Sequence, residues 1–309
     1  MNLSVVIPVY NEAKNIKTTI KEILSAAENI TDIEKIHIIA VDDHSSDDTY
    51  NVINNLNDSR ITCLRLSRRS GSHTALRAGL LEAKGDAVLC ISGDGQDDPS
   101  CLKDILDRWE RGVKIVWALR KSRKEEPWYI RKPAESFYKV ISWMLANEGK
   151  GIDLCRADFF LLDRAIVDAI CACPERNTSL FGLIAWLGFS QDFVEYNRRM
   201  RHSGRSKWSF KSRFGLAANW IIAFSGLPLK IASSVGILMS ILGASGAVYV
   251  IIDKLFFSAL ITGWASIVIL ILLLGGIQLT MLGVIGEYLW RNLDESRNRP
   301  LFFIEKRSG

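Results

Sequence analysis

The sequence lacks the residue patterns of several common site types. Its six cysteines contain no CxxC pair and no framework spacing, so we expect single thiols rather than a metal site or a disulfide scaffold. No basic segment precedes an apolar run at the N-terminus, which argues against a secretory signal peptide. No GxGxxG follows the first apolar run, which argues against dinucleotide binding of the dehydrogenase type. No GxxxxGK(S/T) occurs, which argues against nucleotide hydrolysis by a P-loop.

The charge balance is mild and the apolar residues are unevenly distributed. The 309 residues include 39 basic and 34 acidic side chains, a net charge of +5 that does not argue for a nucleic-acid partner. Mean hydropathy is +0.11, and most of the apolar excess lies after residue 214. We therefore expect a soluble domain of about two hundred residues attached to a membrane segment.

The first part of the chain alternates apolar, β-branched runs with helical patterns. This alternation predicts an α/β fold with a doubly wound, mostly parallel sheet. The expected strands are Leu3–Val9, Ile36–Val41, Ile61–Leu66, Ala87–Ile91 and Val113–Leu119.

Polar clusters follow these expected strands, and the carboxyl ends of parallel strands are where ligands bind in such sheets. The clusters are Asn11-Glu12, Asp42-Asp43, Arg68-Arg69 and Asp94-Gln96. An acid-rich edge needs a divalent ion before it can hold phosphates, and carboxylate oxygens suit Mg²⁺ or Mn²⁺. Taken singly, the clusters at 42–46 and 93–99 are also good turn and N-cap sequences.

Together these motifs resemble a known family. Pro8-Val9-Tyr10-Asn11-Glu12, Asp42-Asp43-x-Ser45-x-Asp47, Gly71…Ala75…Gly79 and Asp94-x-Gln96-Asp97 look like the GT-A-fold family-2 glycosyltransferases. The whole chain is similar to the polyisoprenyl-phosphate glycosyltransferases related to dolichol-phosphate mannose synthase. Ala157-Asp158-Phe159 and Gly204-x-Ser206-Lys207-Trp208 are further matches.

The resemblance implies a role for each matching residue. It implies a UDP-sugar donor and a polyisoprenyl phosphate acceptor. The metal, Mg²⁺ or Mn²⁺, would be bound by Asp94 and Gln96, and Asp158 matches the family's catalytic aspartate. The implied donor-binding residues are Pro8, Tyr10, Glu12, one of Asp42 or Asp43, and Asp94.

Some positions depart from the family pattern. Ser92 stands where the family usually has an aspartate, and a serine offers only a neutral oxygen. We therefore expect weaker metal binding, or a metal that depends more on the diphosphate and Asp97. Arg69, Ser72 and Phe160 also replace residues common in the family.

A basic segment without acids runs from 197 to 213 and precedes an apolar, Trp-bearing stretch. Residues 211–229 therefore read as an amphipathic segment on an anionic membrane surface. Arg201, Arg205 and Lys207 are expected to contact the phosphates of donor and lipid. A solvated basic face is the alternative.

Two uncharged stretches follow, and they predict a transmembrane hairpin of about 231–252 and 259–286 within residues 230–288. Basic residues flank it on one side, so the positive-inside rule places residues 1–210, both termini and the tail at 289–309 in the cytoplasm. The expected location is the inner (cytoplasmic) membrane. Small residues in the first span favour helix packing and a homo-oligomer, and a separate flippase is a further expected partner.

The sequence thus predicts an enzyme that moves a sugar, glucose or an N-acetylhexosamine, from a UDP-sugar to an undecaprenyl-type phosphate with inversion. A synthase acting on another acceptor and a non-catalytic nucleotide-sugar-binding scaffold are the alternatives. A processive polysaccharide synthase is disfavoured, because two spans are too few to line a polymer channel and no QxxRW-like sequence occurs.

Overall fold

The computed structural model describes residues 1–121, 157–173, 175–176, 178–199, 227–256 and 263–308. The chain divides into two compact units, residues 1–214 with 300–309, and residues 215–299. The predicted amphipathic segment at 211–229 lies almost wholly outside the described residues.

The first unit is built on one eight-stranded sheet with the order β7-β5-β6-β4-β1-β2-β3-β8. The pairs of β1 with β2 and β4, of β2 with β3, and of β5 with β7 are parallel. β6 runs antiparallel to β4 and β5, and β8 runs antiparallel to β3. The strands are β1 (Asn2–Val9), β2 (Lys35–Asp42), β3 (Ile61–Leu66), β4 (Ala87–Cys90), β5 (Ile115–Arg120), β6 (Ala157–Asp163), β7 (Gln191–Tyr196) and β8 (Ile304–Ser308).

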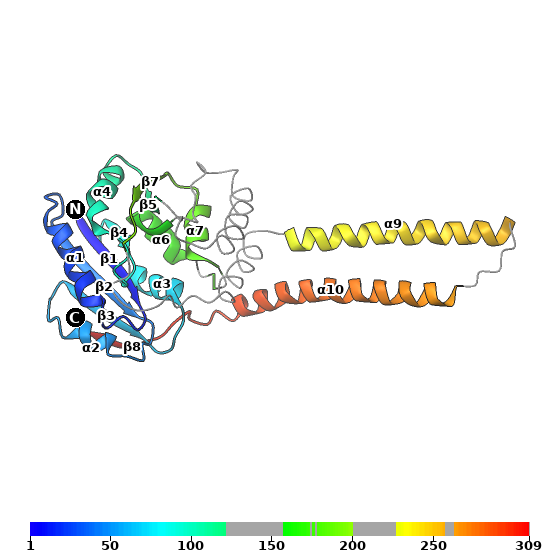
Figure 1. The fold of residues 1–309 in the computed structure, drawn as a ribbon, viewed down its shortest axis with the longest axis horizontal. Helices are drawn as coiled ribbons and strands as arrows, with labels where there is room; N and C mark the ends of the chain where they lie inside the picture. The colour runs from blue at the N-terminus through cyan, green and yellow to red at the C-terminus, as the bar shows by residue number, and fades with distance from the viewer. Residues whose placement is uncertain (122–156, 174, 177, 200–226, 257–262, 309) are drawn as a thin grey trace. The chain divides into compact units, whose positions relative to one another are not determined.

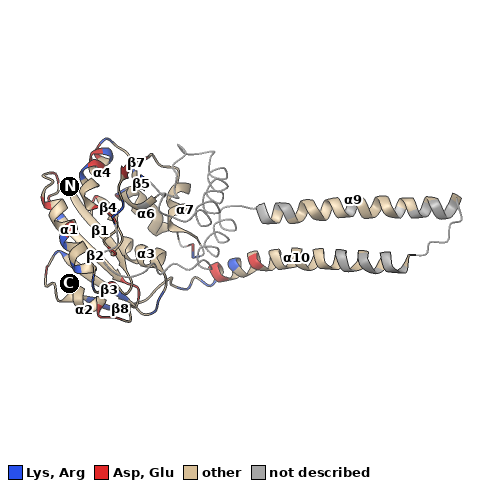
Figure 2. Cartoon of the chain, viewed as in Figure 1, with Lys and Arg blue, Asp and Glu red and all other residues tan. Residues whose placement is uncertain are grey.

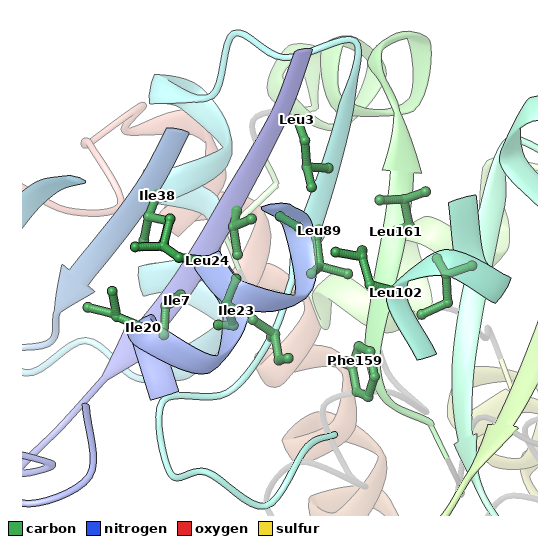
Figure 3. Close-up of a cluster of buried hydrophobic side chains, with 14 of the residues drawn as sticks. Leu3, Ile7, Ile20, Ile23, Leu24, Ile38, Leu89, Leu102, Phe159 and Leu161 are labelled. Carbon is green, nitrogen blue, oxygen red and sulfur yellow. The ribbon is translucent and has the colours of Figure 1, made fainter. Parts of the chain in front are cut away.

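Helices cover both faces of this sheet, which confirms the doubly wound α/β fold (Figure 1). One core packs α1, α2 and α4 against alternate strand residues such as Ile7, Ile38 and Leu89 (Figure 3). The other core packs α3, α6 and α7 against the opposite face. The helices are α1 (Ile16–Glu28), α2 (Thr49–Asn54), α3 (Ser72–Glu82), the short 3₁₀ helix η1 (Pro99–Cys101), α4 (Leu102–Glu110), α6 (Arg164–Ala172) and α7 (Leu180–Trp186).

The five predicted strands are confirmed, and three more complete the sheet. β6 inserts between β4 and β5, so these two predicted strands are not neighbours. Phe160 of β6, one of the family departures, is buried against Trp117 with ring centroids 5.3 Å apart. This residue therefore belongs to the hydrophobic core rather than to the polar edge.

The second unit contains two long helices, α9 (Leu227–Phe256) and α10 (Trp264–Ser296). They contact each other at Gly236, where an added Cβ would lie 3.3 Å from the Cε of Met281. The charged side chains of α10 lie at Glu287 and beyond (Figure 2). In the described part of the chain, no helix offers a stretch that is both long and apolar enough to cross a membrane.

The segment expected to be a tail has regular structure. Residues up to Ser296 continue α10, and residues 304–308 form β8 at the edge of the first unit's sheet. The chain thus leaves the first unit, builds both long helices, and returns to the sheet.

Candidate functional site

The polar clusters predicted at the strand ends do gather at one edge of the sheet. β1, β2 and β4 are adjacent and parallel, so the loops that follow them leave the sheet on the same side. The loop after β3, with Arg69, joins them through contacts described below. The sequence-based prediction that this edge collects polar side chains is therefore confirmed by the topology.

The loop after β1 is held by hydrogen bonds to the loop after β2. Asn11 adopts a positive φ of 54° and donates its backbone N–H to Ser45 Oγ at 2.9 Å. Glu12 is buried, donates its backbone N–H to Thr49 Oγ1 at 2.9 Å, and accepts from Asn15 Nδ2 at 2.6 Å. Pro8 lies in β1, beside Val41 of β2.

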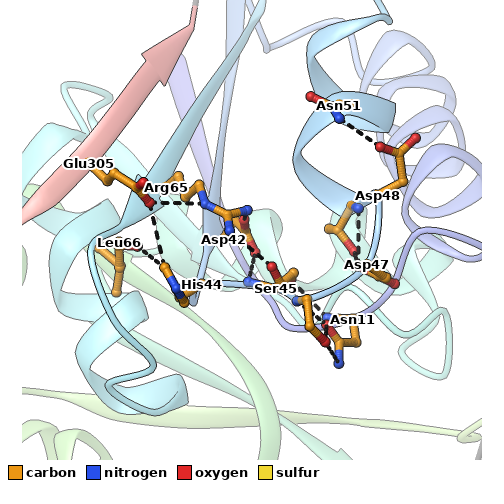
Figure 4. A network of polar contacts seen from close by, with 12 residues as sticks. Asn11, Asp42, His44, Ser45, Asp47, Asp48, Asn51, Arg65, Leu66 and Glu305 are labelled. Carbon is orange, nitrogen blue, oxygen red and sulfur yellow. Dashed lines mark hydrogen bonds and ion pairs between the residues drawn. The ribbon is translucent and has the colours of Figure 1, made fainter.

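Asp42 is an internal anchor. Its side chain is completely buried. Oδ1 accepts from the backbone N–H of Ser45 at 2.9 Å, and Oδ2 pairs with Arg65 Nη1 at 2.8 Å (Figure 4). Because both oxygens are bound within the protein, this carboxylate holds the loop after β2.

Asp43 connects the loop after β2 to the start of α3. Its carboxylate accepts from the backbone N–H groups of Ser70 at 2.6 Å and Gly71 at 2.8 Å. Burial raises the pKa of Asp43, and these two hydrogen bonds oppose that shift. Gly71 has a φ of +93°, which only glycine adopts without strain. The backbone conformation therefore explains why a glycine stands at this position of the motif.

Tyr10 and Arg69 stack at the same edge. The guanidinium carbon of Arg69 lies 4.2 Å from the centroid of the Tyr10 ring, a cation–π distance. This contact places the segment before α3 over the loop after β1. Arg69, a departure from the family pattern, thus lies in the site.

The loop after β4 contains the expected metal ligands. Asp94 is buried, and its Oδ1 accepts from the backbone N–H of Gln96 at 3.1 Å, across Gly95 with a φ of +73°. The Ser92 Oγ accepts from the backbone N–H of Asp94 at 3.4 Å. Gln96 Oε1 accepts from Arg198 Nη2 at 2.9 Å.

The two other acids of this loop hold its shape. Asp97 accepts from the backbone N–H of Ser92 at 3.2 Å and from the Tyr196 hydroxyl at 2.9 Å. Asp98 caps η1 and pairs with Arg199 Nη2 at 2.7 Å. Asp97 therefore has a structural use, although the sequence left it open as a metal ligand.

Among the described residues, no group of three or more His, Cys, Asp or Glu side chains is arranged to hold a metal ion. Asp94 offers a carboxylate, and Gln96 on the same loop offers an amide oxygen that could bind a metal only after its hydrogen bond from Arg198 is released. Mg²⁺ in nucleotide enzymes typically takes one or two carboxylates and completes its shell with water and substrate phosphates. The residues present fit a metal that arrives with a diphosphate, and they do not make an all-protein site.

The two site-adjacent histidines have structural contacts. His44 Nδ1 lies 3.0 Å from the carbonyl oxygen of Leu66. Burial lowers the pKa of His73 to about 4, and its Nδ1 accepts from the backbone N–H of Leu180 at 3.3 Å. His73 is therefore neutral near pH 7.

The remaining predicted site residues are placed only in part. Asp158 lies in β6, next to the buried Phe159. Arg201, Arg205 and Lys207 lie outside the described residues.

Sequence reasoning missed two pairs of residues at the site. Arg198 and Arg199, which it assigned to a basic segment, contact the loop after β4, and the backbone N–H of Arg199 donates to the carbonyl of Gln96 at 2.9 Å. Glu305 and Lys306 of β8 reach the loop after β2, and no local pattern indicates this. A pocket of about 440 Å³ lies there, lined by His44, Ser45, Ser46, Asp47, Tyr50, Asn51, Arg65 and Lys306.

Comparisons with known proteins agree with this geometry. The family model described as Glycosyl transferase family 2 matches residues 4–170. An uncharacterized glycosyltransferase of Synechocystis is 38% identical over 98% of this chain and 95% of its own length. The SfII prophage-derived bactoprenol glucosyl transferase of Shigella flexneri is 35% identical over 99% of this chain and 98% of its own.

A solved structure supports the fold alone. The crystal structure of a mycobacterial protein matches with a TM-score of 0.50 at 16% identity, covering 72% of this chain and 74% of that one. The relatives match along nearly the whole chain, and the family model covers the sheet with its polar edge. The chain therefore belongs to glycosyltransferase family 2 and is a glycosyltransferase.

Proposed function

We propose that this enzyme transfers a sugar from a UDP-sugar to a polyisoprenyl phosphate of the undecaprenyl type at the cytoplasmic face of the membrane. The observation that carries the proposal is the loop after β4. Asp94 and Gln96 lie together at the ligand-binding edge, while Asp97 and Asp98 hold the loop in place. Full-length similarity to a protein named bactoprenol glucosyl transferase supports a polyprenyl phosphate as acceptor.

The donor occupies the edge formed by the loops after β1, β2 and β4. Glu12 and one of Asp42 or Asp43 contact the uracil and ribose, and Pro8 of β1 and Tyr10 of the loop after it bind the donor at the same edge. Both carboxylates also hold loops, Asp42 through Ser45 and Arg65 and Asp43 through the backbone N–H groups of Ser70 and Gly71. Asp94 and Gln96 would hold a divalent ion, which would supply positive charge at the leaving diphosphate.

The reaction is a single displacement at the anomeric carbon, with inversion. An acceptor phosphate oxygen forms the new bond while the bond to the UDP oxygen breaks and UDP takes the electron pair. The second pKa of a phosphate monoester is about 6, so the nucleophile is mostly ionised at pH 7 and needs no strong base. Asp158 orients the donor near this point, and Arg201, Arg205 and Lys207 bind the phosphates.

Membrane attachment is part of the proposal. The stretches 231–252 and 259–286 carry no charged residue. Large apolar side chains such as Ile241, Ile271 and Leu282 are exposed on α9 and α10. We propose that these two stretches form a transmembrane hairpin, which brings the site to a lipid acceptor. In the proposal, the segment 211–229 lies on the membrane surface, and the protein resides in the inner membrane as a homo-oligomer.

The proposal is tested with Asp94→Ala in detergent-solubilised full-length protein. UDP release from UDP-glucose or UDP-N-acetylglucosamine is measured with Mn²⁺ and a short prenyl phosphate. Loss of one charged metal ligand should reduce turnover by at least about a hundredfold, because the charge on the diphosphate is no longer balanced.

The matched control is Asp104→Ala, which removes an exposed carboxylate from the nearby helix α4 and should leave turnover unchanged. Near-normal turnover of Asp94→Ala would contradict the metal assignment. Wild-type protein that releases no UDP when the prenyl phosphate is added would contradict the acceptor. The UDP-sugar that raises the unfolding temperature most in the presence of Mn²⁺ identifies the sugar.

A further inference from the structure

The edge strand β8 contains an irregularity near the loop after β2. In its antiparallel pairing with β3, Leu64 lies opposite Arg307 and Arg65 opposite Lys306, but Leu66 lies opposite Ile304. Glu305 is therefore an extra residue with no partner across the ladder, which is a β-bulge. Bulges redirect a side chain and are common next to active sites.

The bulge directs Glu305 at the guanidinium of Arg65. Glu305 Oε2 lies 3.1 Å from Arg65 Nε and 3.5 Å from His44 Nδ1 (Figure 4). The other two nitrogens of Arg65 are used by the loop after β2. Nη1 pairs with Asp42 at 2.8 Å, and Nη2 donates to the carbonyl of Ser45 at 3.0 Å.

Such an arrangement depends on the shape of arginine. The guanidinium is a rigid planar fork, so fixing its Nε side orients the two Nη atoms on the other side. The side chain of Arg65 is 18% exposed and that of Glu305 is 40% exposed, so the pair is only partly screened by water. Glu305 thereby restrains the geometry with which Arg65 holds Asp42 and Ser45.

The restraint extends to the loop after β1. Ser45 Oγ accepts from the backbone N–H of Asn11 at 2.9 Å, and Asn11 Oδ1 accepts from the backbone N–H of Ser46 at 2.8 Å. These bonds join the two loops that carry Tyr10, Glu12 and Asp43. A connected path of contacts therefore runs from β8 to the proposed donor-binding residues.

We infer that Glu305 is a positioning residue that, through Arg65, sets the conformation of the loops after β1 and β2. The inference rests on the proposed function, since it assumes that these loops bind the UDP-sugar. In this role Glu305 acts through Arg65 and not on the reacting atoms, so we expect it to affect donor affinity and to leave the chemical step unchanged. The strand that follows the two long helices is in this way part of the donor site.

The test is Glu305→Gln, which keeps the size of the side chain and removes its charge. We expect the KM for the UDP-sugar and the Kd for UDP to rise by about two- to fivefold, the upper range of a partly screened ion pair, with kcat within about twofold of wild type. Hydrogen exchange at the amides of Ser45 and Ser46 should become faster.

The matched control is Arg307→Gln, which removes a different ion pair of β8, to Glu82 on α3 at 3.0 Å. This pair does not reach the loop after β2, so KM, Kd and exchange at Ser45 and Ser46 should match wild type. Equal effects of the two variants would mean that only strand docking matters, and would overturn the inference.

The two proposals fail in different ways. Wild-type protein that binds no UDP would contradict the proposed function, while the exchange measurement would still decide whether Glu305 positions the loop. Wild-type protein that binds UDP, together with a Glu305→Gln variant of unchanged KM, Kd and loop exchange, would overturn the inference alone. A lower kcat at unchanged KM would also overturn it.

Discussion

At the scale of single residues, neighbouring carboxylates have different tasks because they point to different surroundings. Asp42 ends β2 and turns to Arg65, while Asp43 bonds to the first residues before α3. In the same way Asp97 is used by Ser92 and Tyr196, and Asp94 lies beside Gln96. The residue types predict an acidic site, and the hydrogen-bond partners show which loop each acid holds.

Ser92→Asp is expected to strengthen metal binding. The Ser92 side chain already lies beside the backbone of Asp94, so an aspartate there adds a second carboxylate to the loop. More ligand charge raises the affinity for divalent cations, and we expect Mn²⁺ to bind about tenfold more tightly in the presence of UDP. Calorimetric titration with Mn²⁺ measures this, with Ser100→Asp, at an exposed position, as the control. An unchanged affinity would mean that position 92 does not face the ion.

At the scale of elements, close packing of α3 on the sheet supports the site. Gly79 allows α3 to lie close against β1 and β2, because glycine has no side chain. An added Cβ would come within 2.3 Å of Val6 Cγ1 and 3.2 Å of Val41 Cγ2. Both valines are completely buried in central strands and cannot move aside. The start of the same helix provides the backbone N–H of Gly71 to Asp43.

Gly79→Ala should therefore destabilise the first unit. We expect the free energy of unfolding to fall by about 1–3 kcal/mol, the usual cost of overpacking a core, despite the better helix propensity of alanine. Urea unfolding measures the loss. Leu81→Ala, at an exposed position of the same helix, should change stability by less than about 0.5 kcal/mol. Equal stability of Gly79→Ala and wild type would show that the helix is free to shift.

At the scale of the whole molecule, the chain passes from the first unit to the second and then returns to the first. The first unit, residues 1–214 and 300–309, contains the sheet, and the second unit, residues 215–299, contains α9 and α10. The sheet is complete only after the chain has passed through both long helices, since β8 is its last strand. Folding of the first unit is thus linked to the part of the chain proposed to enter the membrane.

Membrane attachment is tested by the pair Ile241→Arg and Ile271→Arg, which places one charge at the middle of each proposed span. Both side chains are exposed, and a central arginine costs about 2.5–3.5 kcal/mol on insertion scales. We expect the double variant to shift from the membrane to the soluble or aggregated fraction after cell fractionation. Leu293→Arg, exposed on α10 beyond Glu287, is the control and should stay with wild type. An unchanged membrane fraction of the double variant would contradict the hairpin.

Local patterns were sufficient for the central part of the fold. Buried strands read as continuous apolar runs, so five of the six inner strands are predicted from the sequence, and with them the edge where the polar ends of the parallel strands meet. The inner strand β6 and the two edge strands are not predicted. β7 reads QDFVEY and β8 reads IEKRS, and such polar, partly exposed segments are strands only because β5 and β3 supply hydrogen-bond partners.

The sequence by itself determined the family, strands β1 to β5 and the set of candidate ligands, because these depend on residue type and short-range spacing. The tertiary structure decided which of these residues hold loops, such as Asp42 and Asp97, and it added β8 to the site. The contact between Arg65 and Glu305 joins residues 240 positions apart. Its two members meet only after the sheet and its bulge have formed, so no local pattern specifies it.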